Sequence, residues 1–457
     1  MVRRWVRPVA ALLTVAAVGA TCASTDGLGQ ARWDSPGLVG GGGWPFVSTP
    51  ISTLDARDAS YIPGSSAVRL ADGRVLVIPH GASNPVKISE NDPRVASAVR
   101  GDRGWLEDGL IPGLTADHRD MASRALLDLR MLTAPSGAST ASWYGMWNYV
   151  WPRDAAFHAA AFAATGHLVE ARRILGFLSR VQGADGRWAS RFRPDGSPAT
   201  DGRPVQLDEI GWTLWAAWFV ARYDPAATAY LPMVEKGAEW IASHLGPDGL
   251  PPASSDYFER SVSTEQEPRR PTLGVSGPLL LGLRAAADLS RASHPDKAAR
   301  FHTAATTLSS AITREYGRYG YPRSPLPGGN MDASVTFLAP PFAPADPAVT
   351  AAIANAADRM TVSNGGLLPG ENWGGNRTQA WTPEVALFAL SAVSGGRADE
   401  AVSRLDWLSG HRTSLGVLAE KVNDKGRTAS VAPLGWTAAT VLLALSAQST
   451  PLPVPPA

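Results

Sequence analysis

The chain has 457 residues, of which 44% are hydrophobic, and its formal net charge is +1. That length suffices for one large domain or for two to three ordinary ones. The near-neutral charge lacks the basic excess that displaces counterions from nucleic acid, which argues against nucleic acid as the main partner.

The N-terminus is typical of an export signal. Three arginines among the first seven residues precede an apolar run from Val9 to Ala20. This run is shorter than the roughly 20 residues that span a bilayer, so residues 1–23 are predicted to be a signal peptide. The single cysteine, Cys22, leaves two outcomes open. Cleavage near residue 23 gives a secreted, cysteine-free protein, which we favour, whereas lipidation of Cys22 would anchor the protein to a membrane.

The next two segments differ in composition from the rest of the chain. Residues 24–50 are rich in Gly, Ser and Pro and are predicted to be a linker. Residues 51–111 contain short β-like pieces, such as Ala67–Leu70 and Arg74–Ile78. We interpret this segment as a short N-terminal extension.

From residue 112 to residue 450 the apolar residues follow a helical period, and strand-like runs are nearly absent. Thr382-Pro383 and Trp151-Pro152 fit helix starts, with a capping residue followed by proline. The pattern predicts twelve helices: 115–133, 151–165, 168–182, 206–223, 228–245, 272–292, 295–315, 331–342, 346–361, 380–395, 398–410 and 434–448.

The links between these helices alternate in length. Short links, such as Gly166-His167 and Gly396-Arg397, follow every second helix, and the other links are long and rich in Gly, Pro and aromatic residues. Short links make antiparallel hairpins. Six hairpins with all long loops at one end predict an all-α (α/α)6 barrel whose site lies on the long-loop face.

Each long loop carries polar residues close to the start of the following helix. An acidic residue in the first helical turn gains roughly 0.3–1 kcal/mol from the helix dipole, so a purely structural role remains open for each of these acids. That role does not explain the cation Arg153, nor Glu259, Glu371 and Glu420, which stand in loops. The loop residues are Trp151, Arg153 and Asp154; Gln206, Asp208 and Glu209; Asp256, Glu259 and Arg260; Asn330 and Asp332; Glu371, Asn372 and Trp373; and Glu420, Lys421 and Asp424.

The first loop, NYVWPRDAAF, suggests a binding chemistry. An Arg-Asp pair beside a tryptophan can clamp vicinal hydroxyls, because a carboxylate accepts hydrogen bonds and a guanidinium donates them. In this interpretation Arg153 donates, Asp154 accepts and Trp151 covers an apolar ring face. Two carboxylates that face one cavity would also supply an acid and a base.

Five motifs occur in an order that resembles glycoside hydrolase family 15, which includes glucoamylases, glucodextranases and bacterial trehalase-like enzymes. They are YVWPRDAAF followed by GHLVEARRILGFL; SRFRPDG with QLDEIGWTLWA; MDASVTFLAPPF; LGVLAEKVNDKG; and APLGWTAATVLLAL. The resemblance covers residues 140 to 448. It implies an (α/α)6 barrel and an inverting release of glucose from non-reducing ends of a carbohydrate substrate.

The resemblance also implies residue roles. Arg153 and Asp154 would hold the sugar before the cleaved bond, Glu259 would be the general acid and Glu420 the general base. Further implied positions are the subsite walls Trp151, Trp373 and Trp381, and the pocket-lining or pocket-tuning acids Asp208 and Glu209.

Some positions depart from the family pattern. Phe258 stands where the family usually has tryptophan before its acid, and Lys421 follows the expected base. Glu265 and Glu267 are rival acids, and Glu371, in GENWGG, is a rival base and a candidate sugar contact.

Three functions remain open. The first is an α-glucosidase that acts from the chain end. The second is the same fold acting on another carbohydrate or in another reaction, such as hydrolysis of trehalose or another α-glucoside, or glycosyl transfer. The third is a catalytically weak secreted sugar-binding protein. We expect no metal and no cofactor. The eight histidines form no His-x-x-x-His motif, and neither a Gly-x-Ser-x-Gly elbow nor a dinucleotide-binding fingerprint is present.

Overall fold

A computed structural model describes residues 38–39, 58–79, 84–258 and 270–457. The predicted signal peptide, Cys22 and most of the predicted linker therefore lie outside the described residues, as do Glu259, Glu265 and Glu267. Among the described residues, no helix combines the length and the apolarity that a bilayer span requires.

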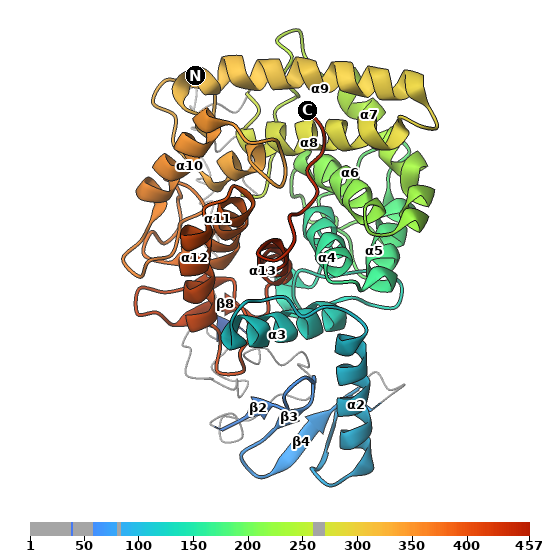
Figure 1. Ribbon diagram of the computed structural model, residues 1–457, viewed down its shortest axis with the longest axis vertical. Coiled ribbons are helices and arrows are strands. Elements are labelled where there is room, and N and C mark those ends of the chain that lie inside the picture. Colours follow the sequence, from blue (N-terminus) through green and yellow to red (C-terminus); the bar gives the residue numbers. More distant parts are fainter. Residues whose placement is uncertain (1–37, 40–57, 80–83, 259–269) are drawn as a thin grey trace, which may run out of the picture.

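Two concentric layers of helices make up the body of the molecule (Figure 1). The inner layer consists of helices whose residues are buried almost throughout, which explains why they are apolar on every side. It comprises α4 (Pro152–Ala164), α6 (Asp208–Ala221), α8 (Leu273–Ser290), the 3-10 helix η5 (Ala333–Leu338), α11 (Thr382–Ser394) and α13 (Gly435–Ala447).

The outer layer consists of amphipathic helices, each with one buried stripe. It comprises α3 (Ala116–Leu132), α5 (Leu168–Val181), α7 (Leu231–Ser243), α9 (Pro295–Glu315), α10 (Pro347–Met360) and α12 (Ala398–Gly410). Each inner element contacts the next around the ring, and α13 returns to contact α4. The ring is therefore closed, which confirms the predicted (α/α)6 barrel.

Two predicted helices differ in detail. The segment expected to be helical over 331–342 forms only η5, because Asp332 caps it at Ser334 and Pro340 and Pro341 lack the N–H groups that would continue it. The helix expected over 228–245 begins as a 3-10 turn, η2 (Pro225–Tyr230), and becomes α-helical at α7.

The N-terminal extension is a small antiparallel sheet covered by a helix, at the bottom of Figure 1. Its strands pair in chain order: β2 (Ser60–Tyr61), β3 (Val68–Arg69), β4 (Arg74–Val77) and β5 (Val86–Ser89). Helix α2 (Pro93–Glu107) was not predicted, although Asp92 caps it and Pro93 opens it. Its few buried residues, Val95, Val99 and Leu106, leave only a weak helical period.

The two faces of this sheet contact different partners. Val75 and Val77 pack with α2, whereas Leu76 packs with Leu415 and Val417 of the barrel, in the loop after α12. This alternation follows from the period of two along a strand. The extension thus contacts the loop that carries Glu420.

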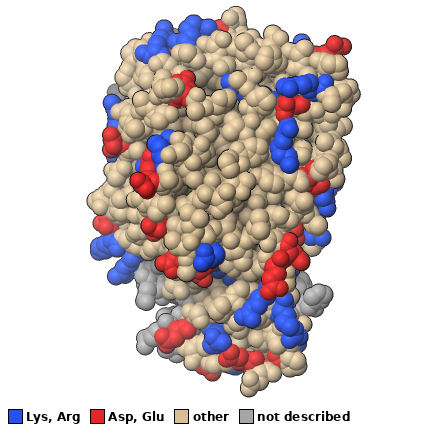
Figure 2. Space-filling view, viewed as in Figure 1, with Lys and Arg blue, Asp and Glu red and all other residues tan. Residues whose placement is uncertain are grey.

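A second four-stranded sheet lies at the same loop. Its order is β1 (Leu38–Val39), β8 (Thr428–Val431), β7 (Lys421–Val422) and β6 (Ala380–Trp381), and β1 runs parallel to β8. The predicted linker therefore contributes a strand to this sheet. In Figure 2 charges of both signs are mixed over the visible face.

Candidate active site

One cavity of about 260 Å³ lies at the ends of the inner helices. That volume is below the roughly 300–1,000 Å³ typical of sites for drug-sized ligands, and it suits a small ring. Its walls come from the long loops and the first turns of α4, α11 and α13. The lining residues are Ala141, Met146, Trp147, Trp151, Arg153, Asp154, Arg203, Tyr257, Phe258, Pro369, Trp373, Trp381, Pro383, Glu384, Glu420, Lys421, Leu434 and Trp436.

Six of the predicted site residues meet at this cavity, although they are spread over most of the barrel sequence. They are Trp151, Arg153, Asp154, Trp373, Trp381 and Glu420. The predicted acid, Glu259, lies outside the described residues, but its neighbour Phe258 lines the cavity.

The Arg-Asp pair stands in the first turn of α4, where Pro152 opens the helix. The Arg153 guanidinium donates to Asp154 Oδ2 at 3.1 Å and to Gln206 Oε1 at 3.1 Å. It also lies over the Trp436 ring, with 4.8 Å between Cζ and the ring centroid. Both side chains of the pair are buried, so their donors and acceptors hold fixed directions in the cavity wall.

Three neighbours contact the carboxylate of Glu420. Trp147 Nε1 donates to its Oε1 at 3.2 Å, the Ser430 hydroxyl donates to its Oε2, and Lys421 Nζ lies 3.4 Å from Oε2. The Lys421 ammonium also sits 4.0 Å from the centroid of the Trp381 ring. A buried carboxylate held in this way can accept a proton from a water molecule in the cavity.

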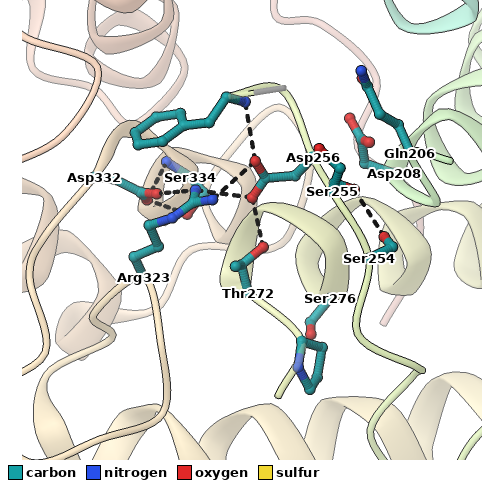
Figure 3. A network of polar contacts seen from close by, with 12 residues as sticks. Gln206, Asp208, Ser254, Ser255, Asp256, Thr272, Ser276, Arg323, Asp332 and Ser334 are labelled. Atoms are coloured by element: carbon teal, nitrogen blue, oxygen red, sulfur yellow. Dashed lines mark hydrogen bonds and ion pairs between the residues drawn. The ribbon is translucent and has the colours of Figure 1, made fainter. Parts of the chain in front are cut away.

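Asp256, Arg323 and Asp332 form a buried ion network (Figure 3). The Arg323 guanidinium is 2.8 Å from both Asp256 Oδ2 and Asp332 Oδ2. Asp256 also accepts from Thr272 Oγ1 at 2.6 Å and from the Phe258 amide at 3.0 Å. Arg323 Cζ lies 4.0 Å from the Phe258 ring centroid, so the network fixes the residue that directly precedes Glu259.

Asp208 and Glu209 are fully buried in the first turn of α6 and are not among the lining residues of the cavity. Arg153 Nη1 lies 3.7 Å from Asp208 Oδ2. Burial raises the pKa of Asp208 to about 7, although Arg153 opposes the shift. Asp208 therefore lies behind the Arg153–Asp154 pair and does not reach the cavity surface.

Glu371, the rival base, is also not among the lining residues. Its carboxylate pairs with Arg359 at 3.1 Å and accepts from the Met331 amide at 3.0 Å. These contacts hold the GENWGG loop, and the same loop brings Trp373 to the cavity.

Sequence reasoning missed Glu384. The Thr382-Pro383 step before it was interpreted as a helix start, so the glutamate looked like an ordinary first-turn acid. The structure places it in the cavity wall, 2% exposed. The missed signal was that an apolar helix, buried on all sides, begins with this acid. Trp147, Arg203, Tyr257 and Trp436 were also missed as lining residues. No cluster of three potential metal ligands occurs in the part of the chain that the structure describes.

The solved structures of similar fold include glycosidases and glucoamylases. A glycosidase solved in complex with glucose matches with a TM-score of 0.62 and 19% identity, over 73% of this chain and 97% of that chain. A bacterial glucoamylase complexed with acarbose matches with a TM-score of 0.64 and 16% identity, over 80% of this chain and 60% of that chain. A glucoamylase from Saccharomycopsis fibuligera matches with a TM-score of 0.57 and 13% identity, over 71% of this chain and 92% of that chain.

In sequence, an uncharacterized glycosyl hydrolase of Methanocaldococcus jannaschii is 34% identical over 98 residues, which cover 21% of this chain. The matched segment spans 16% of the length of that relative. No protein-family profile matches the chain. At these identities the solved structures establish the fold. The resemblance to the glucoamylase group therefore holds at that level: the chain has the (α/α)6 barrel of glucoamylases, with one cavity at the ends of its inner helices.

Proposed function

We propose that this protein is an inverting glycoside hydrolase that releases glucose from the non-reducing end of an α-glucoside. The position of Glu420 supports this proposal most strongly, because both of its carboxylate oxygens accept hydrogen bonds, from Trp147 and Ser430. It shares one cavity with the buried Arg153–Asp154 pair and with several tryptophan faces. A sugar ring matches such a site, because it offers hydroxyls at its edge and an apolar face.

In the proposed reaction Glu420 is the general base and Glu259 the general acid. Glu420 takes a proton from water while the water oxygen bonds to the anomeric carbon from the face opposite the leaving group. The glycosidic C–O bond breaks, and the leaving oxygen takes the proton of Glu259. Solvent then restores both carboxyl groups. Arg153 and Asp154 would hold the hydroxyls of the sugar that is released.

The first test follows the anomeric proton signals of maltose, isomaltose, short α-glucans and trehalose mixed with the protein. We expect β-glucose before mutarotation, and the substrate that yields it identifies the linkage. α-Glucose as the first product would contradict inversion. No glucose release from any of these sugars would contradict the proposed glucosidase, and the alternatives would then be action on another carbohydrate or sugar binding without catalysis.

The second test is Glu420→Gln, which keeps the shape but cannot take a proton. Loss of a general base typically costs 10²–10⁴-fold, so kcat should fall by about that factor while glucose binding persists. The control is Glu400→Gln in the first turn of the outer helix α12, where the carboxylate pairs with Arg397 and Arg404. A Glu420→Gln variant with near-normal kcat would assign the base elsewhere.

A further inference from the structure

A carboxyl oxygen without a hydrogen-bond partner belongs to a residue that lines the cavity. Glu384 stands in the first turn of α11 and is 2% exposed. Within the described part of the chain, its Oε2 atom has no hydrogen-bond partner and no ion pair is formed by its carboxyl group. Leaving a buried polar atom unpaired costs about 1–3 kcal/mol. A bound ligand or water molecule can supply the missing partner when such an atom belongs to a residue that lines a cavity.

The surroundings of Glu384 favour its neutral form. Burial, with Glu420 and Asp332 adding to it, raises the pKa of Glu384 to about 8, and Arg153 opposes this shift. At neutral pH the side chain is therefore a carboxylic acid, which has one O–H donor and one carbonyl acceptor.

This chemistry complements the other polar groups of the cavity. Arg153 supplies only donors, and the carboxylates of Asp154 and Glu420 supply only acceptors. A sugar hydroxyl both donates and accepts. A neutral acid beside Glu420 can satisfy a hydroxyl in either direction and adds no second negative charge next to the proposed base.

We propose that Glu384 contacts the sugar that occupies the cavity, as a neutral hydrogen-bond donor and acceptor for one of its hydroxyl groups. This assignment rests on the proposed function for the identity of the ligand as a sugar. It gives Glu384 a binding role, separate from the proton transfers of Glu259 and Glu420.

The assignment implies a pH limit on binding. The charged and titratable groups that share this cavity are Arg153 and Asp154 from α4, Glu420 and Lys421 from the loop at β7, Arg203 from the loop before α6, and Tyr257 from the loop before α8. Asp332, before η5, also acts on Glu384. When pH rises through about 8, Glu384 ionises, loses its O–H donor and repels Glu420. Sugar binding should then weaken.

The experiment titrates glucose calorimetrically into the wild type, Glu384→Gln, Glu384→Ala and the control Glu400→Gln from pH 5 to pH 9. Glutamine keeps a neutral donor and acceptor, so its Kd should stay within about threefold of wild type at pH 6 and remain flat to pH 9. Wild-type binding should weaken by about tenfold above pH 8, and Glu384→Ala should bind about tenfold more weakly throughout. The control should match wild type.

Kinetics on a sugar that the wild type hydrolyses separates binding from catalysis. Glu384→Ala should raise KM with a smaller change in kcat. If Glu384→Ala bound glucose with the wild-type Kd, the assignment would be wrong. A Glu384→Gln variant that binds glucose normally but loses kcat by 100-fold or more would also overturn it, because that result makes Glu384 a proton donor. If Glu384→Ala misfolds, as judged by circular dichroism, the glutamine variant and its pH profile decide.

The glucose titration also distinguishes this inference from the proposed function. If the wild type hydrolyses nothing but binds glucose in a Glu384-dependent manner, the hydrolase proposal fails and the binding role stands. If the wild type hydrolyses a sugar and Glu384→Ala is unaffected, only the binding role fails.

Discussion

Single residues decide how Glu420 is held, and Ser430 is the clearest case. Its hydroxyl donates to Glu420, and its backbone has a φ of 68°, in the left-handed region. A hydrogen bond to a charged group contributes about 1.5–3 kcal/mol, so Ser430→Ala and Ser430→Gly should each lower kcat by about 10-fold or more. Glycine tolerates this φ without strain. Steady-state kinetics showing a loss in the alanine variant alone would assign the effect to the backbone and not to the hydroxyl.

Sequence reasoning identified the residues whose chemistry is unusual for their position. Arg153 is a cation at a helix start, and Glu420 is an acid in a loop, so both stood out. Glu384 did not, because an acid in a first helical turn has an ordinary structural explanation. Asp208 illustrates the opposite problem, since its sequence position resembles that of Asp154 but its side chain lies behind the cavity.

At the scale of elements, strand β4 of the N-terminal extension packs against the loop that carries the proposed base, Glu420. Leu76 packs with Leu415 and Val417, and Val75, on the other face, packs with α2. Leu76→Ala should therefore lower kcat as well as stability, the latter by about 2–5 kcal/mol. Val75→Ala is the matched control and should lower stability while kcat is preserved. Denaturant unfolding and kinetics of both variants test this, and equal kcat values would remove the extension from any role in positioning Glu420.

The helices were predictable because each has a long, repeated apolar pattern, and most boundaries moved by only a few residues. The sheet β1-β8-β7-β6 was not predictable. Its strands are two to four residues long, and β1 pairs with a strand near the other end of the chain. Such pairing leaves no local period to detect.

At the scale of the whole molecule, the free energy of unfolding should depend on the protonation of buried acids such as Asp208. Folding raises the pKa of Asp208 to about 7, so between about pH 4 and pH 7 the folded state binds more protons than the unfolded state. Stability from this group therefore falls as pH rises across that window. Asp208→Asn removes this pH-dependent contribution. Within this window, the free energy of unfolding of Asp208→Asn minus that of wild type should therefore rise by up to about 1.4 kcal/mol per pH unit. The measurement is urea unfolding of both proteins across this pH range. If the free energy of unfolding changed with pH equally in both, Asp208 would be ionised in the folded state, contrary to the prediction.

The closed ring was predictable from the helical period together with the loop lengths, because alternating short and long links permit few arrangements of twelve helices. The cavity within it was predictable only in outline, since its walls depend on side-chain directions in loops.

The pairing of β1 with β8 also sets an order of events during synthesis. β1 leaves the ribosome well before its partner β8, and α13, which closes the ring against α4, emerges after β8. Individual hairpins can form as they emerge, but Glu420 cannot accept its hydrogen bond from Ser430 until β8 is available. The cavity should therefore stay incomplete until α13 has docked against α4.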